Sequence, residues 1–300
     1  MSQFKTIGLI GRPGHAGVVD SLQRLLDFLA TRKLSIVLDE VTAGLVPDHG
    51  QRKVCTREQL SRNCDLVIVV GGDGSMLNAA HIIANEKVPV IGINRGRLGF
   101  LTDILPEEID SRIGDVLDGK FTVESRFLLD LEAVHEGERR HLGCALNDVV
   151  LHPGKAAQMI EFELFVDDRF VYSQESDGLI VATPTGSTAY AMSAGGPIMH
   201  PSLDAIVLVP MYPHSLSSRP IVVDGDSEIR MVIAHKHDIL PQLSCDGEVK
   251  FTAVPGDEII VRKKATPLQL IHPLDHSFYQ ACRSKLGWGN RLVRSTGQEG

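Results

Sequence analysis

Apolar strands that alternate with helices are the feature that most restricts how this chain can fold. Runs that are apolar almost throughout occur at 5–11, 34–38, 65–70 and 88–93. Apolar residues from Val18 to Leu29 recur with helical spacing, and Met76 to Ala84 can form a second helix. Strands that are apolar on both faces are typical of a parallel sheet covered by helices on both sides. We therefore predict a doubly wound α/β domain over residues 1–110.

The pattern changes after Pro106. A short helical segment at 107–117 is followed by short apolar runs, which breaks such as "HPGK", "DGDS" and "VPGDE" separate. Regularly spaced strands between such turns favour a β-sandwich-like domain. We place this β-rich domain at 111–274 and expect a C-terminal segment, 275–300, to pack back on the first domain.

Composition argues against several classes of protein. The N-terminus does not resemble a signal peptide and no run is long enough to cross a bilayer, so we expect a cytoplasmic protein. The cysteines show no CxxC pairing and the histidines no ligand spacing, so we expect neither a disulfide framework nor a structural metal site. A formal net charge of −8 gives no electrostatic footprint for nucleic acid or an anionic membrane.

The loop "GGDG" at 71–74 follows the third apolar run and carries a carboxylate where a phosphate-binding loop would carry a lysine. Ligands bind outside the carboxyl ends of parallel strands, and glycines allow a ligand to approach the backbone closely. Asp73 could bind a metal ion or accept a proton from a hydroxyl that attacks a phosphate. Alternatively, Asp73 or Ser75 caps the helix that follows, and the loop alone favours neither interpretation.

Two further loops carry groups suited to an anion or a sugar. Asn94, Arg95 and Arg97 in "NRGRLGFLTD" could donate to an anion, although a solvated Arg-Gly turn is the commoner explanation of such a pattern. Asn147 and Asp148 could bind sugar hydroxyls, but Asn-Asp is also a plain turn signal, and taken alone the pair favours the turn.

The stretch 177–198 is the most informative, because small hydroxyl residues and glycines gather in "PTGSTAYAMSAGG". This composition suits a nucleotide lying along the backbone, with Tyr190 available to stack on a base. A surface loop would be polar throughout, whereas Ala189 to Met192 includes apolar residues. The chain has no GxxxxGK[ST], HExxH or GxSxG motif.

Taken together and in this order, these motifs closely resemble the NAD kinase family. The similarity continues through "LVPMYPHSLSSRP", "SCDGE" and "KLGWGN", and so covers nearly the whole chain. The resemblance implies an enzyme that phosphorylates the 2′-hydroxyl of the adenosine ribose of NAD to give NADP. It also implies ATP as phosphoryl donor, a divalent cation (Mg²⁺ or Mn²⁺), an active site between the two domains, and a homodimer or homotetramer.

The resemblance further implies roles for individual residues. Asp73 would be the general base, Gly74 would let the NAD approach, and the metal would be held mainly through the ATP phosphates. Asn147 and Asp148 would hold ribose hydroxyls, and Asp177 would contact the nicotinamide end. The dinucleotide would be lined by a continuous run: Thr188, Ala189, Tyr190, Ala191, Met192 and Ser193.

Some positions depart from the common family pattern. Asp148 stands where many members have Glu, Glu248 where Gln is usual, and Glu175 where some members have a basic residue. Two alternatives remain open. Lipid kinases and phosphofructokinases also carry GGDG, but they lack the "PTGSTAYAMSAGGPI" block. A non-catalytic dinucleotide sensor would not need the carboxylate of Asp73.

Overall fold

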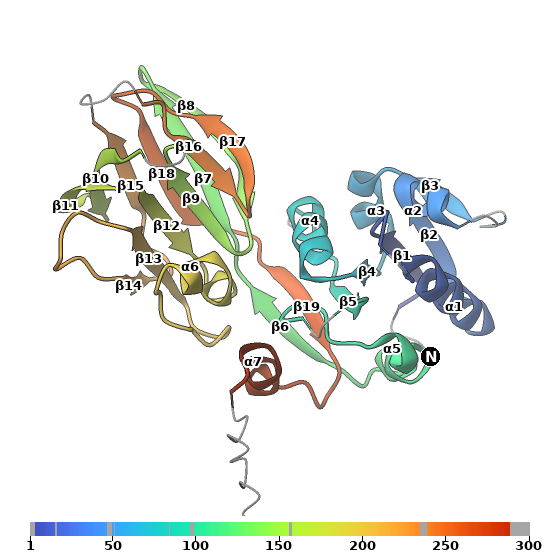
Figure 1. The fold of residues 1–300 in the computed structure, drawn as a ribbon. Coiled ribbons are helices and arrows are strands. Elements are labelled where there is room, and N and C mark those ends of the chain that lie inside the picture. Colours follow the sequence, from blue (N-terminus) through green and yellow to red (C-terminus); the bar gives the residue numbers. More distant parts are fainter. Residues whose placement is uncertain are drawn as a thin grey trace, which may run out of the picture.

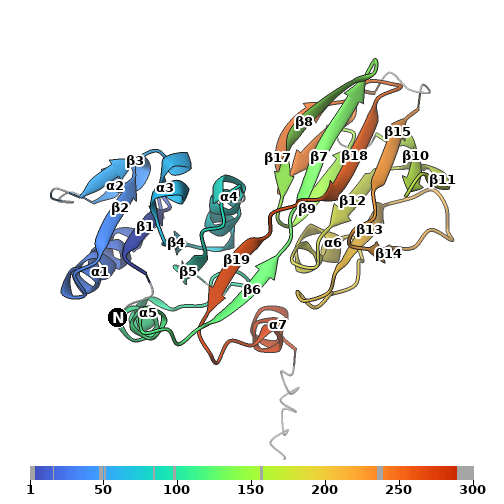
Figure 2. The same cartoon turned by 180° about the vertical axis from the view of Figure 1, so that it is seen from behind.

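The computed structural model describes residues 4–15, 17–46, 50, 52–83, 85–96, 99–155, 158–234 and 239–288. A sheet covered by helices forms one part of the molecule, and a pair of facing antiparallel sheets forms the other (Figures 1 and 2). No helix in the described part of the chain is long and apolar enough to cross a membrane.

The first sheet is built around parallel strands that are mostly buried. Its spatial order is β3 (Lys53–Cys55), β2 (Ser35–Asp39), β1 (Thr6–Gly11), β4 (Leu66–Gly71), β5 (Val90–Asn94), β19 (Leu268–His272) and β6 (Thr122–Arg126). Neighbours from β3 to β19 are parallel, and β6 pairs antiparallel with β19. The strand order reverses between β1 and β4, and ligands bind at such a switch point.

Helices cover both faces of this sheet. One face packs against α1 (Val18–Thr31) and α5 (Ile109–Leu117), which follows the 3₁₀ turn η1 (Pro106–Glu108). The other face packs against α3 (Arg57–Asn63) and α4 (Asp73–Ile83), while α2 (Glu40–Leu45) joins β2 to β3. The residues predicted to form a helical stripe, among them Leu22 and Leu29, are fully buried in α1. The predicted doubly wound α/β domain is confirmed.

Other described strands form two antiparallel sheets that share a core. One sheet has the order β11 (Arg169–Ser176), β10 (Ile160–Val166), β15 (Ile229–Ile233), β18 (Glu258–Lys263), β7 (Leu129–His135) and β8 (Glu138–Ala145). The second has the order β14 (Ile221–Asp224), β13 (Ala205–Met211), β12 (Gly178–Ala182), β9 (Asp148–His152), β16 (Gln242–Cys245) and β17 (Glu248–Thr252). Side chains from both sheets, such as Phe162 and Val181, meet in one cluster. The predicted β-sandwich-like domain is confirmed.

Two strands connect the domains. β6 leads after a short break into β7, and β18 leads into β19, so a pair of chain segments passes from one domain to the other (Figure 2). Both β6 and β19 lie within the predicted segment 111–274, yet they pair in the first sheet. Their pairing joins residues far apart in sequence, which local patterns do not reveal.

Helix α7 (Phe278–Leu286) lies between the two domains (Figure 1). The ring of Phe278 is 6.2 Å from that of Phe100 in the first domain and 5.1 Å from that of His200 in the second. The predicted C-terminal segment beyond residue 288 lies outside the described residues.

Candidate functional site

Two adjoining cavities bring the sequence motifs together. A cavity of about 700 Å³ is lined by Asp73, Phe100, Leu101, Asn147, Thr185, Thr188, Ala189, Ser284, Lys285 and Leu286. A second cavity, of about 520 Å³, is lined by residues that include Asp148, Asp177, Tyr190, Tyr212 and Asp246. Asn147 and Ala189 line both cavities. We call the first the Asp73 cavity and the second the Tyr190 cavity.

Asp73 begins α4, but its carboxylate points away from that helix toward the loop that follows β5. It accepts hydrogen bonds from the backbone N–H groups of Phe100 and Leu101, at 3.0 and 3.1 Å, and from the Thr102 hydroxyl at 3.2 Å. These contacts belong to "NRGRLGFLTD". Two motifs predicted separately therefore form one unit. Within the described residues, the Asp73 side chain accepts its hydrogen bonds from outside α4 and does not cap that helix.

Gly99 makes this close contact possible. A Cβ atom at position 99 would lie 2.0 Å from Asp73 Oδ1 and 2.5 Å from the Thr102 hydroxyl. Any larger residue would push the loop away from the carboxylate. The glycine of this motif is therefore explained by packing against Asp73.

Lys285 on α7 completes the surroundings of the carboxylate. Its Nζ lies 2.7 Å from Asp73 Oδ2, and both side chains are partly exposed, at 26% and 28%. The same ammonium lies over the Phe100 ring, 4.7 Å from its centroid. The C-terminal helix thus delivers a cation to the Asp73 cavity, a role that local sequence patterns did not predict.

The start of β9 is held by a buried carboxylate on the neighbouring hairpin. Asp246 accepts hydrogen bonds from the backbone N–H groups of Leu146, Asn147 and Asp148, at 2.8 to 3.0 Å. Its other partner is His81 Nε2 at 2.6 Å, from the helix that begins at Asp73. One carboxylate therefore fixes the Asn147-Asp148 pair and links it to α4.

The hydroxyl-rich stretch packs directly on the Asn147 backbone. It forms the 3₁₀ turn η2 (Gly186–Thr188) and the short helix α6 (Tyr190–Ser193). The Thr183 hydroxyl donates to Leu146 O at 2.6 Å, and Thr183 N donates to Asn147 O at 2.9 Å. A Cβ atom at Gly186 would lie 2.0 Å from Asn147 O. This turn therefore holds Thr185 and Thr188 at the Asp73 cavity.

The Asp148 carboxyl occupies an unusual electrostatic position. The residue is only 4% exposed. Burial, with the nearby Asp246 carboxylate adding to it, raises the pKa of Asp148 to about 7. The carboxyl group therefore changes its charge near neutral pH, on the wall of the Tyr190 cavity.

Exposed aromatic rings line the Tyr190 cavity. Tyr190 is 51% exposed and Tyr212 is 81% exposed. Tyr212 also has a positive φ of 43°, which is uncommon for a non-glycine residue. Large exposed rings beside a cavity are suited to stacking on a planar base.

The other predicted residues take different positions. Gly74 and Ser193 are exposed and Met192 is partly buried, but they line neither cavity. Ala191 is fully buried in a cluster with residues of β12 and β13. Arg97 lies outside the described residues. The structure thus brings Asp73, Asn147, Asp148, Asp177, Thr188, Ala189 and Tyr190 to the two cavities.

Several site residues were missed by sequence reasoning. They are His81, Thr185, Tyr212, Asp246 and Lys285. Tyr212, Asp246 and Lys285 lie within motifs that the resemblance covers, "LVPMYPHSLSSRP", "SCDGE" and "KLGWGN". The motif letters were the available signal, but their contacts come from parts of the chain far apart in sequence.

An α/β domain, a β-sandwich and a hydroxyl-lined cavity between them are typical of a two-domain nucleotide-binding enzyme. Residues 7–121 match the model of the ATP-NAD kinase N-terminal domain, and residues 146–273 that of the ATP-NAD kinase C-terminal domain. The chain belongs to the ATP-NAD kinase family. It is accordingly a kinase that acts on NAD.

Individual relatives agree with this assignment. The chain is 62% identical over 292 residues to the NAD kinase of Azotobacter vinelandii, covering 97% of this chain and 99% of that one. The yeast NADH kinase complexed with NADH superposes with a TM-score of 0.88 at 24% identity, over 97% of this chain and 90% of that chain. The NAD kinase from Archaeoglobus fulgidus in complex with ATP superposes with a TM-score of 0.70 at 25% identity, over 94% of this chain and 97% of that chain.

Proposed function

We propose that the chain transfers the terminal phosphoryl group of ATP to the 2′-hydroxyl of the adenosine ribose of NAD, giving NADP and ADP. The observation that carries this proposal is the position of the Asp73 carboxylate in a cavity that shares Asn147 and Ala189 with the Tyr190 cavity. An acceptor hydroxyl presented from one cavity can meet a phosphate held in the other.

In this proposal Asp73 is the general base. The proton of the ribose hydroxyl passes to the carboxylate, its oxygen forms a bond to the γ-phosphorus, and the bond from that phosphorus to the β–γ bridging oxygen breaks. The ammonium nitrogen of Lys285 lies 2.7 Å from Asp73 Oδ2 and blocks that oxygen. Movement of the ammonium from Asp73 to the phosphates of ATP frees that oxygen for the hydroxyl and places a positive charge where negative charge develops.

The second cavity is proposed to hold the dinucleotide. Asn147 and Asp148 bind ribose hydroxyls, Asp177 contacts the nicotinamide end, and Tyr190 stacks on a base. Thr188 and Ala189 line the path between the cavities, and Gly74 leaves room for the NAD beside Asp73. We propose that Ala191, Met192 and Ser193 support the residues that line the Tyr190 cavity.

A divalent cation, Mg²⁺ or Mn²⁺, is proposed to be held mainly through the ATP phosphates. The oxygen donors of the Asp73 cavity, the carboxylate of Asp73 and the hydroxyls of Thr185 and Thr188, are of the kind that such hard cations prefer. When bound, the cation neutralises phosphate charge. The protein contributes the base, the ammonium and the hydroxyl-lined wall.

The reaction is tested by incubating the protein with Mg²⁺-ATP and either NAD or NADH and measuring NADP(H). We expect Asp73→Asn to lower kcat by roughly 10²–10⁴-fold with a smaller effect on KM, because the base is lost while the cavity remains. Asp110→Asn, at an exposed carboxylate paired with Arg24 on the surface, is the matched control.

Two outcomes would overturn these assignments. No NADP(H) above background from the wild-type protein contradicts the reaction and favours a dinucleotide sensor. Near-full turnover by Asp73→Asn contradicts the role of Asp73 as base.

We also propose a homodimer or homotetramer. The support comes from the resemblance to the NAD kinase family, and large apolar side chains of the second domain are available for contacts between subunits: Phe170 is 58% exposed, Leu216 95% and Val222 52%. Light scattering on the purified protein gives the number of subunits directly, and the mass of a single chain would contradict the proposal.

A further inference from the structure

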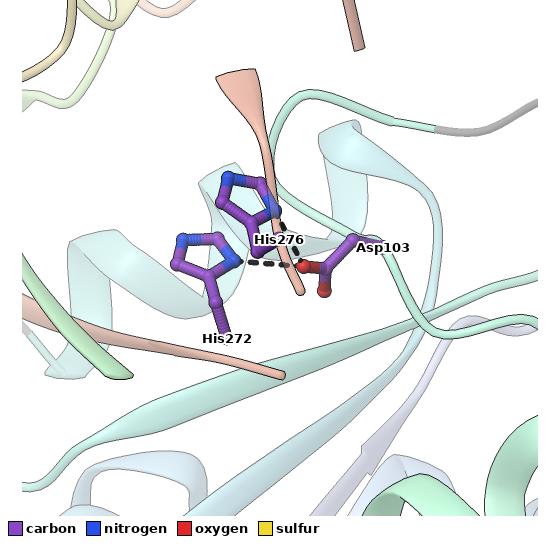
Figure 3. A group of neighbouring side chains, drawn as sticks. All are labelled: Asp103, His272 and His276. Atoms are coloured by element: carbon purple, nitrogen blue, oxygen red, sulfur yellow. Dashed lines mark hydrogen bonds and ion pairs between the residues drawn. The ribbon is translucent and has the colours of Figure 1, made fainter. Parts of the chain in front are cut away.

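A cluster of imidazole and carboxylate groups includes a residue of the loop after β5, whose backbone N–H groups hold Asp73 (Figure 3). It lines neither the Asp73 cavity nor the Tyr190 cavity. Asp103 comes from the loop after β5, His272 from the end of β19, and His276 from the turn before α7. The Nδ1 atoms of His272 and His276 lie 2.9 and 2.8 Å from Asp103 Oδ2. The two imidazole rings are stacked, with centroids 3.8 Å apart.

The cluster is incompletely satisfied by the protein. Within the described residues, Asp103 Oδ1 and His272 Nε2 are buried polar atoms without a hydrogen-bond partner. The side chain of His272 is fully buried and that of Asp103 is 13% exposed. A buried carboxylate oxygen without a partner is destabilising, and a cation bound there would offset that cost.

The donor atoms match a particular class of cation. Two imidazole nitrogens and one carboxylate oxygen, all within 4.8 Å of one another, form a set that Zn²⁺ accepts with water as fourth ligand. Mg²⁺ prefers an all-oxygen set, so the cluster favours Zn²⁺ over Mg²⁺. Tetrahedral ligands at zinc distances lie roughly 3.3 Å apart, so binding requires each imidazole nitrogen to move only about 0.5 Å away from Asp103 Oδ2.

The surroundings also suit a metal centre. The Nε2 atom of His272 lies 3.6 Å from Glu124 Oε2, and Arg126 pairs with the same carboxylate. A carboxylate behind a ligating histidine is the usual outer partner in zinc sites. A cavity of about 190 Å³, lined by residues that include Asp103 and His276, provides a path for the ion and room for a water ligand.

We propose that Asp103, His272 and His276 form a zinc-binding site separate from the phosphoryl-transfer site. Asp103 ends the loop whose backbone N–H groups hold Asp73, and His276 lies two residues before the start of the helix that carries Lys285. A bound ion therefore ties together the two segments that surround the Asp73 carboxylate. Sequence spacing did not predict this site, because Asp103 and His272 are 169 residues apart.

The test measures metal binding by the full-length protein without ATP or NAD. Chelator-treated protein is dialysed against Zn²⁺, bound metal is determined by elemental analysis, and affinity is determined by competition with a chromophoric chelator. We expect about one Zn²⁺ per chain and a loss of at least roughly 10²-fold in affinity for His276→Gln and Asp103→Asn. Binding by the wild type also raises its Tm.

The matched control is His135→Gln. His135 forms a histidine–carboxylate pair with Asp257 at 2.6 Å, away from the cluster, and its loss leaves zinc affinity unchanged. Circular dichroism verifies that each variant is folded. In the Co²⁺-substituted wild type we expect the visible absorption of a tetrahedral site, and we expect His276→Gln to lose it.

Either of two results overturns the proposal. One is a wild-type protein that binds no Zn²⁺. The other is a folded His276→Gln variant that binds Zn²⁺ as tightly as the wild type, as it would if cysteine thiols held the ion. Because binding is measured without substrates, failure of the proposed kinase reaction would leave this result unaffected.

Discussion

At the scale of single residues, the Asp73 carboxylate is the most heavily constrained group in the Asp73 cavity. Two backbone N–H groups, the Thr102 hydroxyl and the Lys285 ammonium all approach it. Such donors fix the direction of the carboxylate and also compete with a substrate hydroxyl for its oxygens. In the proposed reaction, the ammonium on α7 must therefore leave the carboxylate before a substrate hydroxyl can take its place.

Replacement of Lys285 tests this argument. We expect Lys285→Met to lower kcat by roughly 10²-fold, because the cation that meets the phosphates is lost, while the free energy of unfolding changes little. Steady-state kinetics with ATP and NAD measure the effect. Lys120→Met, at an exposed lysine paired with Asp115, is the control and should keep wild-type kcat. An unchanged kcat in Lys285→Met would remove this residue from the mechanism.

The buried carboxyl of Asp148 makes stability depend on pH. Its pKa is raised from 3.8 to about 7, so the folded chain binds this proton more tightly than the unfolded chain. The free energy of unfolding therefore falls as the pH rises through this interval, by up to about 4 kcal/mol for the isolated group. We expect Asp148→Asn to gain stability relative to the wild type between pH 4.5 and pH 8.

Urea unfolding at both pH values measures this difference. Asp118→Asn is the control without a pH effect in this interval, because the Arg32 guanidinium lowers the pKa of Asp118 from 3.8 and its carboxylate is therefore charged at both pH values. An Asp148→Asn variant whose stability relative to the wild type is the same at both pH values would contradict the raised pKa.

At the scale of secondary structure elements, α4 links the two cavities. The helix begins at Asp73, and further along it the His81 side chain contacts the carboxylate of Asp246. That carboxylate accepts hydrogen bonds from the backbone N–H groups at the start of β9. A shift of this helix would therefore move the proposed base and the ribose-binding pair together. The Asp246 side chain is 1% exposed, so its contacts are made away from water.

Replacement of Asp246 should break the connection between α4 and the start of β9. We expect Asp246→Ala to cost about 3–5 kcal/mol of unfolding free energy, because buried N–H groups lose their acceptor, and to weaken NAD binding. Asp257→Ala is the control, since Asp257 is equally buried and also accepts from a backbone N–H and a histidine. Both variants should lose stability, but only Asp246→Ala should raise the Kd for NAD. Unchanged NAD affinity in Asp246→Ala would refute the linkage.

Sequence patterns predicted the parts of the fold and site that depend on local spacing. The helical stripe of α1 and the glycine-flanked Asp73 are recognisable because the relevant residues are neighbours in sequence. The contact between Lys285 and Asp73 spans 212 residues, and that between Asp246 and Asn147 spans 99. Contacts of this kind arise only when separate elements pack, so their residues had no local signature.

At the scale of the whole molecule, α7 is the element that contacts both domains beside the cavities. Phe278 packs near Phe100 of the first domain, and Tyr279 packs near His200 of the second, with ring centroids 5.7 Å apart. The strands β6 and β19 connect the same domains on another side (Figure 2). The position of Lys285 therefore depends on how α7 sits against each domain.

Replacing the two aromatic residues of α7 in turn tests which ring positions Lys285. We expect Phe278→Ala to lower kcat by roughly tenfold, because the helix loses a ring that packs near both Phe100 and His200 and the ammonium no longer stays near Asp73. Its half-buried ring should contribute about 1–2 kcal/mol to stability. Tyr279→Ala removes an exposed ring that packs near His200, and should change kcat far less. Kinetics and urea unfolding of both variants decide the matter. Equal losses of kcat would mean that both rings hold α7 in place, and an unchanged kcat in Phe278→Ala would mean that Lys285 keeps its position without the contacts of that ring.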